Sequence, residues 1–190
     1  MSPYPVQTDR ETIIETARIL IERDGVEHLS LGNVAAELGI KAPSLYRHIE
    51  SKSALLQAVI EHTYLSLFRA YDKALSNSGE NPTEQLMALS QAQRTFAHAN
   101  PNSYLLAYAA QDPELRADPN MLLERAVIIQ KIIIQISGEE NSLPALRGLL
   151  ALAHGFIMLE LNGQFRRGGD LSAAFEESIR AYLLGWESKK

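Results

Sequence analysis

Cationic and hydrogen-bonding side chains gather between residues 41 and 52. Lys41, Arg47 and Lys52 supply three positive charges there, against one negative charge from Glu50, and His48 adds a hydrogen-bond donor. Side chains of these types contact the phosphate oxygens and base edges of duplex DNA. The segment is therefore a candidate nucleic-acid interface, provided that the fold presents it on an exposed face.

Two short helices joined by a tight turn are predicted to present this segment. Ser30 is a suitable N-cap for the first helix, and Gly39 allows the sharp turn that ends it. The apolar residues expected to face inward are Val34, Ala35 and Leu38 in the first helix and Leu45 and Ile49 in the second. The outer face of the second helix is then free, and it carries Pro43, Ser44 and Arg47 beside Lys41. Such a helix-turn-helix places its second helix in the major groove of DNA.

The rest of the sequence also predicts helices, so the expected fold class is all-α. Thr8 and Glu11 fit a capping box at the start of a first helix that ends at Gly25. Ser51 is a suitable cap for a fourth helix that begins at Lys52. Later helices are expected at residues 83–99, 101–111, 119–137, 142–168 and 171–187, because Pro and Gly residues divide the chain there.

This pattern predicts a small front domain followed by a larger helical one. We expect a helix-turn-helix DNA-binding domain at residues 1–52, a connecting fourth helix at residues 53–76, and a helical effector-binding and dimerisation domain at residues 77–190. Because the fourth helix packs on both sides, it can carry motion from one domain to the other.

Several classes of protein are excluded by composition and motifs. The chain has no Cys, which excludes disulfides, thiolate metal sites and Cys nucleophiles. Its five His residues lack the spacing of metal ligands, and no phosphate-binding loop or hydrolase motif occurs. We therefore expect no enzyme activity, no metal and no cofactor; an all-α enzyme would need turnover that depends on His154 or Glu160.

The sequence also predicts a cytoplasmic protein without a membrane partner. The first residues lack the basic and apolar regions of a secretory signal. The apolar stretches at residues 127–136 and 149–161 are interrupted by polar residues, and we interpret both as buried helices.

The net charge of −5 is mildly unfavourable for a nucleic-acid partner. The acids of the front domain lie mostly on the first helix and its exit, where they could face away from DNA. The cationic footprint is still modest, so dimerisation is expected to be needed for useful affinity.

The segment LSLGNVAAELGIKAPSLYRHIESKSALL, residues 29–56, closely resembles the DNA-binding region of TetR (tetracycline-repressor-like) regulators. The shared features are a Gly followed by a β-branched residue before the second short helix, Leu-Tyr within that helix, and Lys-x-x-Leu-Leu opening helix four. The resemblance covers about residues 9–65. It implies a transcriptional regulator, most simply a repressor that binds a pseudo-palindromic operator as a homodimer.

The resemblance also implies roles for single residues. Tyr46, His48, Lys52 and Ser30 correspond to phosphate-contacting positions, whereas Pro43, Ser44 and Arg47 correspond to base-facing ones. Gly32 stands where a base-reading Arg is often found, and Ala42 offers no hydrogen-bonding group, so readout of DNA shape gains weight. Alternatively, Tyr46 packs in the core, Arg47 pairs with Glu50 or Glu37, and His48 and Lys52 are ordinary surface residues.

Residues 149–161, followed by Phe165, resemble the C-terminal domain of a family branch that has a His-Gly pair and then Leu-Glu. The family pairs two copies through the last two long helices. The residues expected at this dimer interface are Ala151, Gly155, Gly163, Phe175, Ile179, Tyr182, Leu183 and Trp186. Small residues allow close helix approach, and the last helix has a broad apolar stripe. The alternative is that these residues form an intramolecular core.

The family also binds small ligands in its helical domain, so we expect a small apolar effector. The candidate pocket residues are Phe96, His98, Tyr104, Tyr108, Met121, Ile128, Ile132, His154 and Met158. Core packing is the alternative role for each. A different function remains open as well, namely a helical ligand-binding or scaffold protein whose helix-turn-helix makes protein contacts.

Overall fold

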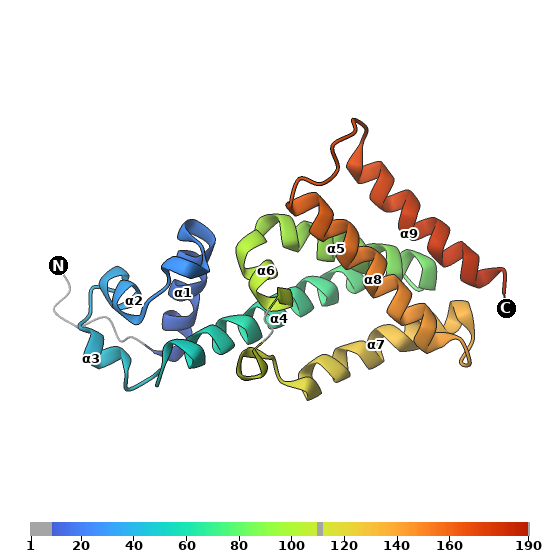
Figure 1. Cartoon of the computed structure of the whole chain (residues 1–190). Helices are drawn as coiled ribbons and strands as arrows, with labels where there is room; N and C mark the ends of the chain where they lie inside the picture. The colour runs from blue at the N-terminus through green and yellow to red at the C-terminus, as the bar shows by residue number, and fades with distance from the viewer. Residues whose placement is uncertain (1–8, 110–111, 190) are drawn as a thin grey trace. The chain divides into compact units, whose positions relative to one another are not determined.

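The computed structural model describes residues 9–109 and 112–189, which form nine α-helices, two 3-10 turns and no strand (Figure 1). The predicted all-α fold class is confirmed. The chain divides into two compact units, each described by itself below. Unit 1 comprises residues 1–65 and 100–118, and unit 2 comprises residues 66–99 and 119–190. This division differs from the expected boundaries, because residues 100–118 pack with the front helices.

Unit 1 holds the short helices at the front of the chain. Its elements are α1 (Arg10–Asp24), a 3-10 turn (Val26–His28), α2 (Leu31–Glu37), α3 (Ala42–Leu45), the first half of α4 (Lys52–Asn77), α6 (Pro101–Ala109) and a second 3-10 turn (Pro113–Leu115). Its core is apolar, and Ile13, Val34, Leu45 and Leu55 are completely buried in it.

Side-chain caps fix where the front helices begin. Ser30 and Ser51 act as predicted: their hydroxyls accept from the amides of Asn33 and Ala54, at 3.1 and 3.0 Å. The cap of α1 differs from the prediction, since the Asp9 carboxylate accepts from the Thr12 amide at 2.8 Å. The predicted cap, Thr8, lies outside the described residues.

Helix α6 is held against α1 by a carboxylate at its N-terminus. Glu22 of α1 accepts hydrogen bonds from the backbone amides of Asn102 and Ser103, at 3.0 and 2.8 Å. The Asn102 side chain donates to the last carbonyls of α1, and Arg18 donates to the Asn100 side chain at 3.0 Å. A carboxylate at this position satisfies amides that the helix itself leaves unpaired. These contacts explain why α6 belongs to unit 1.

Unit 2 is a bundle of longer helices. It contains the second half of α4, α5 (Pro82–Ala99), α7 (Pro119–Ser137), α8 (Ser142–Leu161) and α9 (Leu171–Glu187). Most bounds lie within two residues of prediction, but α8 ends at Leu161 rather than at 168. Asn162 is the C-cap, and Gly163 after it has φ of 62°, a left-handed conformation that stops the helix.

A buried ion pair ties three helices of unit 2 together. Arg94 of α5 donates from Nε and Nη2 to the two carboxylate oxygens of Glu160 on α8, at 2.8 and 2.6 Å. Its Nη1 donates to the Ser172 hydroxyl on α9 at 3.0 Å, and His98 Nε2 lies 2.9 Å from Glu160 Oε2. The Glu160 side chain is only 8% exposed. The Arg94 guanidinium holds the pKa of Glu160 below its usual range.

Helix α8 is long and apolar enough to cross a membrane by length and composition alone, with a mean hydropathy of 1.5 over its best window. Core helices of proteins without a membrane pass the same test. Only 33% of that window is buried inside the chain, so the prediction of a buried helix at residues 149–161 is only partly met. One face of α8 is left uncovered.

We predict that Glu22→Ala weakens the docking of α6. Two backbone amides would lose their acceptor, so the free energy of unfolding should fall by about 1 kcal/mol, as for a lost helix cap. Hydrogen exchange at Asn102 and Ser103 should accelerate. Glu27→Ala, which removes an exposed acid from the turn after α1, is the control. Unchanged exchange at both amides in Glu22→Ala would contradict the capping role.

We predict that Glu160→Gln destabilises unit 2 by about 3 kcal/mol, because Arg94 keeps a buried charge without a counter-charge. Chemical denaturation measures this, with the exposed Glu140→Gln as control. The pKa of Glu160 is lowered from 4.5, so its stabilising effect is complete above pH 4.5 and is lost as the pH falls through the lowered pKa. Glu160→Gln should flatten this part of the acid dependence; an unaltered acid profile would refute the assignment.

Candidate nucleic-acid interface

The turn between α2 and α3 has the hydrogen bonding that ends a helix sharply. Gly39 has φ of 66°, a conformation that Gly adopts without a steric penalty. Its amide donates to Ala36 O at 3.1 Å, and the Ile40 amide donates to Ala35 O at 3.0 Å. This pair of bonds is the Schellman arrangement, which closes α2 and turns the chain toward α3.

Helix α3 is anchored by two buried apolar side chains. Leu45 is completely buried, and Ile49 is nearly so. The amides of His48 and Ile49 both donate to Leu45 O, at 2.9 and 3.0 Å, and so continue the turn past the end of the helix. With Leu45 and Ile49 held inward, the residues between and around them are directed toward solvent.

The structure exposes most of the predicted DNA-contacting residues. Lys41, Pro43, Tyr46, Arg47, His48 and Lys52 are exposed, whereas Ser44 and Ser30 are half-buried. The Tyr46 side chain is 55% exposed, so its ring does not lie in the core. All eight residues belong to α3, its flanks and the starts of α2 and α4, and they are therefore positioned by one short stretch of unit 1.

The cations around α3 are free to meet phosphates. Among residues 9–109 and 112–189, Lys41, Arg47 and Lys52 form no ion pair. Glu37, one of the proposed alternative partners of Arg47, instead accepts from Arg23 at 3.3 and 3.4 Å. Several acids of the front helices hydrogen-bond to cations or backbone amides of the same unit.

Two helix starts add backbone donors to the same region. The first turn of α4 begins at Lys52, and Ser51 caps only part of it, leaving amides at the positive end of a 26-residue helix. At α2, the Ser30 oxygen accepts from the Asn33 amide, and its hydroxyl hydrogen remains available to donate. Such groups suit an anionic ligand.

An acid lies close to one of the predicted phosphate contacts. The pKa of Asp9 is lowered chiefly by the Thr12 amide that it accepts, and in smaller part by the nearby charge of His48.

The two departures from the family pattern have different structural meanings. A side chain added at Gly32 would meet only Ser30 Oγ, at 3.7 Å, so the position has room for a larger residue. Ala42 instead packs against the core of unit 1. Its small side chain serves packing, whereas the position of Gly32 is open to a larger side chain.

The residues predicted to line an effector pocket are divided between the two units. Tyr104, completely buried, and Tyr108 belong to α6 of unit 1, where their ring centroids are 4.5 Å apart. The other seven, Phe96, His98, Met121, Ile128, Ile132, His154 and Met158, lie in unit 2. His98 contacts Glu160, and burial lowers the pKa of His154.

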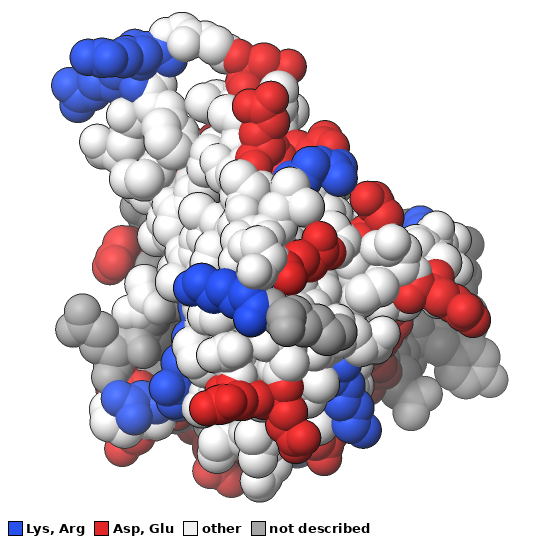
Figure 2. All heavy atoms as spheres, turned by 90° about the vertical axis from the view of Figure 1, so that its right-hand side faces the viewer, with Lys and Arg blue, Asp and Glu red and all other residues white. Residues whose placement is uncertain are grey.

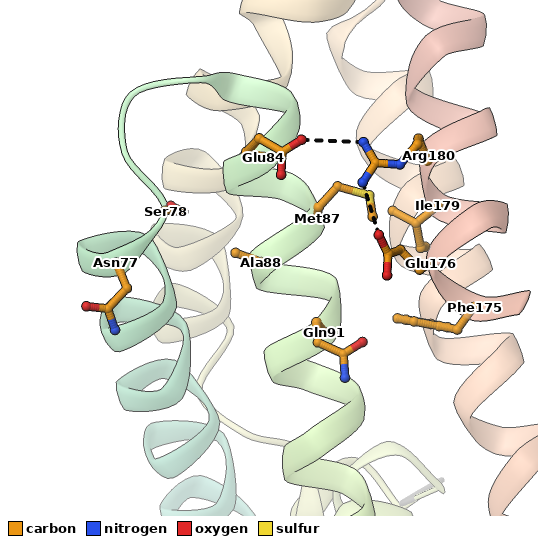
Figure 3. Close-up of a pocket in the computed structure, with 10 residues that line it drawn as sticks. All are labelled: Asn77, Ser78, Glu84, Met87, Ala88, Gln91, Phe175, Glu176, Ile179 and Arg180. Carbon is orange, nitrogen blue, oxygen red and sulfur yellow. Dashed lines mark hydrogen bonds and ion pairs between the residues drawn. The ribbon is translucent and has the colours of Figure 1, made fainter. Parts of the chain in front are cut away.

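An open pocket of about 450 Å³ lies on α5, between the end of α4 and α9 (Figure 3). Apolar side chains of Met87, Phe175 and Ile179 line it, and Arg180 joins Glu84 and Glu176 across one end. This pocket could not be predicted from the sequence, because its residues come from helices whose packing the sequence pattern does not specify. No group of three or more metal-ligating side chains occurs in the described parts of the chain.

The residues predicted at the dimer interface separate into two groups. Phe175, Ile179 and Leu183 are buried inside unit 2, and the Tyr182 hydroxyl donates to Ala145 O of the same chain at 2.9 Å. Gly163 lies in the turn after α8 rather than on the helix. Ala151 is exposed, and Gly155 and Trp186 are half-buried. The first group forms intramolecular core, as the alternative interpretation held.

Comparisons with known proteins identify the family. Residues 13–59 match the family model described as bacterial regulatory proteins of the tetR family, and residues 86–182 match the tetracyclin repressor-like C-terminal domain. The regulator YobS of Bacillus subtilis, named an uncharacterized HTH-type transcriptional regulator, is 27% identical over 97% of this chain and 95% of its own.

Solved structures share the whole fold. A protein of unknown function from Rhodococcus sp. has a TM-score of 0.84 at 21% identity, covering 98% of this chain and all of the other. A TetR variant from Acinetobacter baumannii in complex with minocycline has a TM-score of 0.71 at 22% identity, covering 96% and 98%. With a matched N-terminal reading domain, a C-terminal model that spans half of the chain and an exposed cationic helix-turn-helix, the chain belongs to the tetR family of DNA-binding transcriptional regulators.

Proposed function

We propose that the protein is a ligand-responsive repressor that binds a pseudo-palindromic operator as a homodimer. The observation that carries this proposal is a set of exposed cations, Lys41, Arg47 and Lys52, which form no ion pair with the described residues. They surround α3, which Leu45 and Ile49 anchor. Two copies would place α3 in successive major grooves, roughly 34–36 Å apart. Tyr46, His48, Lys52 and Ser30 contact phosphates in this proposal.

Base reading falls to the remaining exposed residues of the segment. Arg47 has the fork of donors that pairs with guanine, and Pro43 and Ser44 lie on α3 just before it. Gly32 contributes no side chain. We therefore propose that few bases are read directly and that DNA shape supplies part of the specificity.

The proposed effector is a small molecule that binds unit 2. The Acinetobacter baumannii TetR variant crystallised with minocycline supports a ligand in this fold. In this chain, half-buried His154 and the apolar Phe96, Met158 and Ile132 are proposed to contribute to the site. A bound effector would act through the chain segments that link the units, at residues 65/66, 99/100 and 118/119, and only by its different affinity for the two states. A regulator of bacterial DNA would act in the cytoplasm, and no catalytic role is proposed.

Selection of binding sites from a random duplex pool is the first test. At a stated salt concentration, we expect enrichment of a palindrome whose half-sites lie about one helical turn apart. A regulator that reads DNA as a dimer produces such symmetry. If a folded dimer enriched no sequence with or without candidate effectors, the helix-turn-helix would serve protein contacts, as in a scaffold protein.

Substitutions at the phosphate contacts test the site itself. Lys52→Ala should weaken binding to the selected duplex about tenfold and lower the salt slope by ~2, one per protomer. Tyr46→Phe keeps the ring but removes the hydroxyl, so it should weaken binding without changing the salt slope. Fluorescence anisotropy at several salt concentrations measures both. Lys73→Ala removes an exposed charge elsewhere on α4 and should change neither; equal effects of Lys52→Ala and Lys73→Ala would sink the assignment.

A further inference from the structure

The pocket on α5 has a rigid apolar floor. All of its lining residues belong to unit 2, and Met87 of α5 lies beside Phe175 and Ile179 of α9 (Figure 3). Phe175 is 1% exposed and Ile179 is completely buried, so packing inside unit 2 fixes both side chains. The Phe175 ring also meets the Phe156 ring edge-on, with the ring centroids 5.1 Å apart. Such a floor exists before a ligand arrives, as is usual for small-molecule sites.

The size and shape of the pocket suit a small molecule. Glu84, Ala88 and Gln91 follow one another at spacings of four and three residues, so they share one side of α5. Ala88 lies between the two longer polar side chains, and its single methyl group leaves the space above it open. The volume of about 450 Å³ falls within the range of known small-molecule sites, roughly 300–1,000 Å³.

Negative charge exceeds positive charge around the pocket. Residues 77–91 contain two acids and no Lys or Arg, and α9 contains three acids and one cation, Arg180. On the face shown in Figure 2, toward which α9 ends, acidic side chains lie in several places. A surface of this sign attracts cations and repels anions.

The ion pairs across one end of the pocket are weak enough to rearrange. Arg180 lies 3.4 Å from one oxygen of Glu84 and 3.1 Å from one oxygen of Glu176. The Arg180, Glu84 and Glu176 side chains are 43%, 54% and 59% exposed, and exposed pairs contribute little stability. Each carboxylate has about four acceptor sites, more than Arg180 uses. A second cation can therefore share both carboxylates with Arg180.

The charged and apolar parts of the pocket are arranged along its length. In Figure 3, Glu84 and Arg180 lie at one end, and Phe175 and Gln91 lie toward the other. An anion would find only Arg180, which two carboxylates already surround. A neutral molecule would cover the apolar floor but gain nothing from the acidic rim. A molecule with a cationic group and an apolar body matches both parts.

We propose that this pocket binds a small organic cation, whose ammonium group lies at Glu84 and Glu176 and whose aromatic or aliphatic body lies over Met87 and Phe175. None of the residues assigned to the effector site under the proposed function lines this pocket, so it is a second site. The inference goes beyond the proposed function and does not depend on DNA binding. Because the pocket joins α5 to α9, an occupant stabilises the packing of these two helices.

Methyl NMR of the intact protein tests the site directly. The chain has four Met residues; Met87 lines the pocket, and Met158 belongs to the proposed effector site. Titration with 2-phenylethylamine, which is protonated at neutral pH, should shift the Met87 ε-methyl signal until it saturates and leave the Met158 signal in place. The uncharged 2-phenylethanol should bind about fivefold more weakly or worse, because it lacks the attraction to the carboxylates. The anion 3-phenylpropanoate should bind more weakly still.

Variants of the rim separate charge from packing. The double variant E84Q/E176Q should weaken binding of the amine about fivefold and leave binding of the alcohol nearly unchanged. Arg180→Gln removes the competing cation and should strengthen binding of the amine. Ala88→Leu fills the pocket and should abolish binding of both probes. Glu177→Gln, which neutralises an exposed acid of α9 outside the pocket, is the matched control and should change neither.

The two Met signals also identify the results that would overturn the proposal. Equal affinity for the amine and the alcohol would remove the role of the carboxylates. A saturable shift at Met158 without one at Met87 would place the cation at the effector site instead, and no saturable shift at Met87 would leave the pocket without a ligand of this class. An unchanged Met158 signal in each variant shows that unit 2 is folded. None of these results bears on the DNA selection, which reports separately on the proposed function.

Discussion

The anchoring of α3 is the constraint on which the DNA-reading end depends. A helix of four residues, Ala42–Leu45, cannot be stable by itself, because forming the first turn costs more than its few hydrogen bonds return. Its conformation is therefore fixed from outside, by the burial of Leu45 and Ile49 and by the turn at Gly39. With Leu45 and Ile49 held inward, the side chains of Tyr46, Arg47 and His48 face solvent.

Side-chain hydrogen bonds also explain why unit 1 includes a distant part of the chain. The Glu22 carboxylate accepts hydrogen bonds from the amides of Asn102 and Ser103, which lie 80 and 81 positions later in the sequence. A carboxylate used in this way keeps its negative charge and lies at the N-terminus of α6, where the helix dipole is positive. The capping thus gives α1 a wider support within unit 1.

Local features of the fold could be predicted from the sequence, and features that depend on distant partners could not. Ser30, Ser51 and Gly39 act within three or four residues of themselves, so their roles were visible in the sequence. The apolar stripe of α9 was equally visible. Whether Phe175 and Ile179 faced another chain or their own core depended on how α5 and α8 pack, which periodicity does not encode. The pocket between α5 and α9 could not be predicted for the same reason. Nor could the assignment of α6 to unit 1 rather than to unit 2.

The modest positive charge of one helix-turn-helix makes DNA affinity depend on dimerisation. Three cations per head, if all meet phosphates, give a salt dependence of about −2.7 in log-log slope, and a second head doubles it. One head alone would bind weakly at physiological salt, so operator affinity depends on how firmly two copies are held together. Buried Glu160 ties α8 to α5 of its own chain, whereas exposed Leu143, Arg147 and Leu150 leave another side of the same helix uncovered.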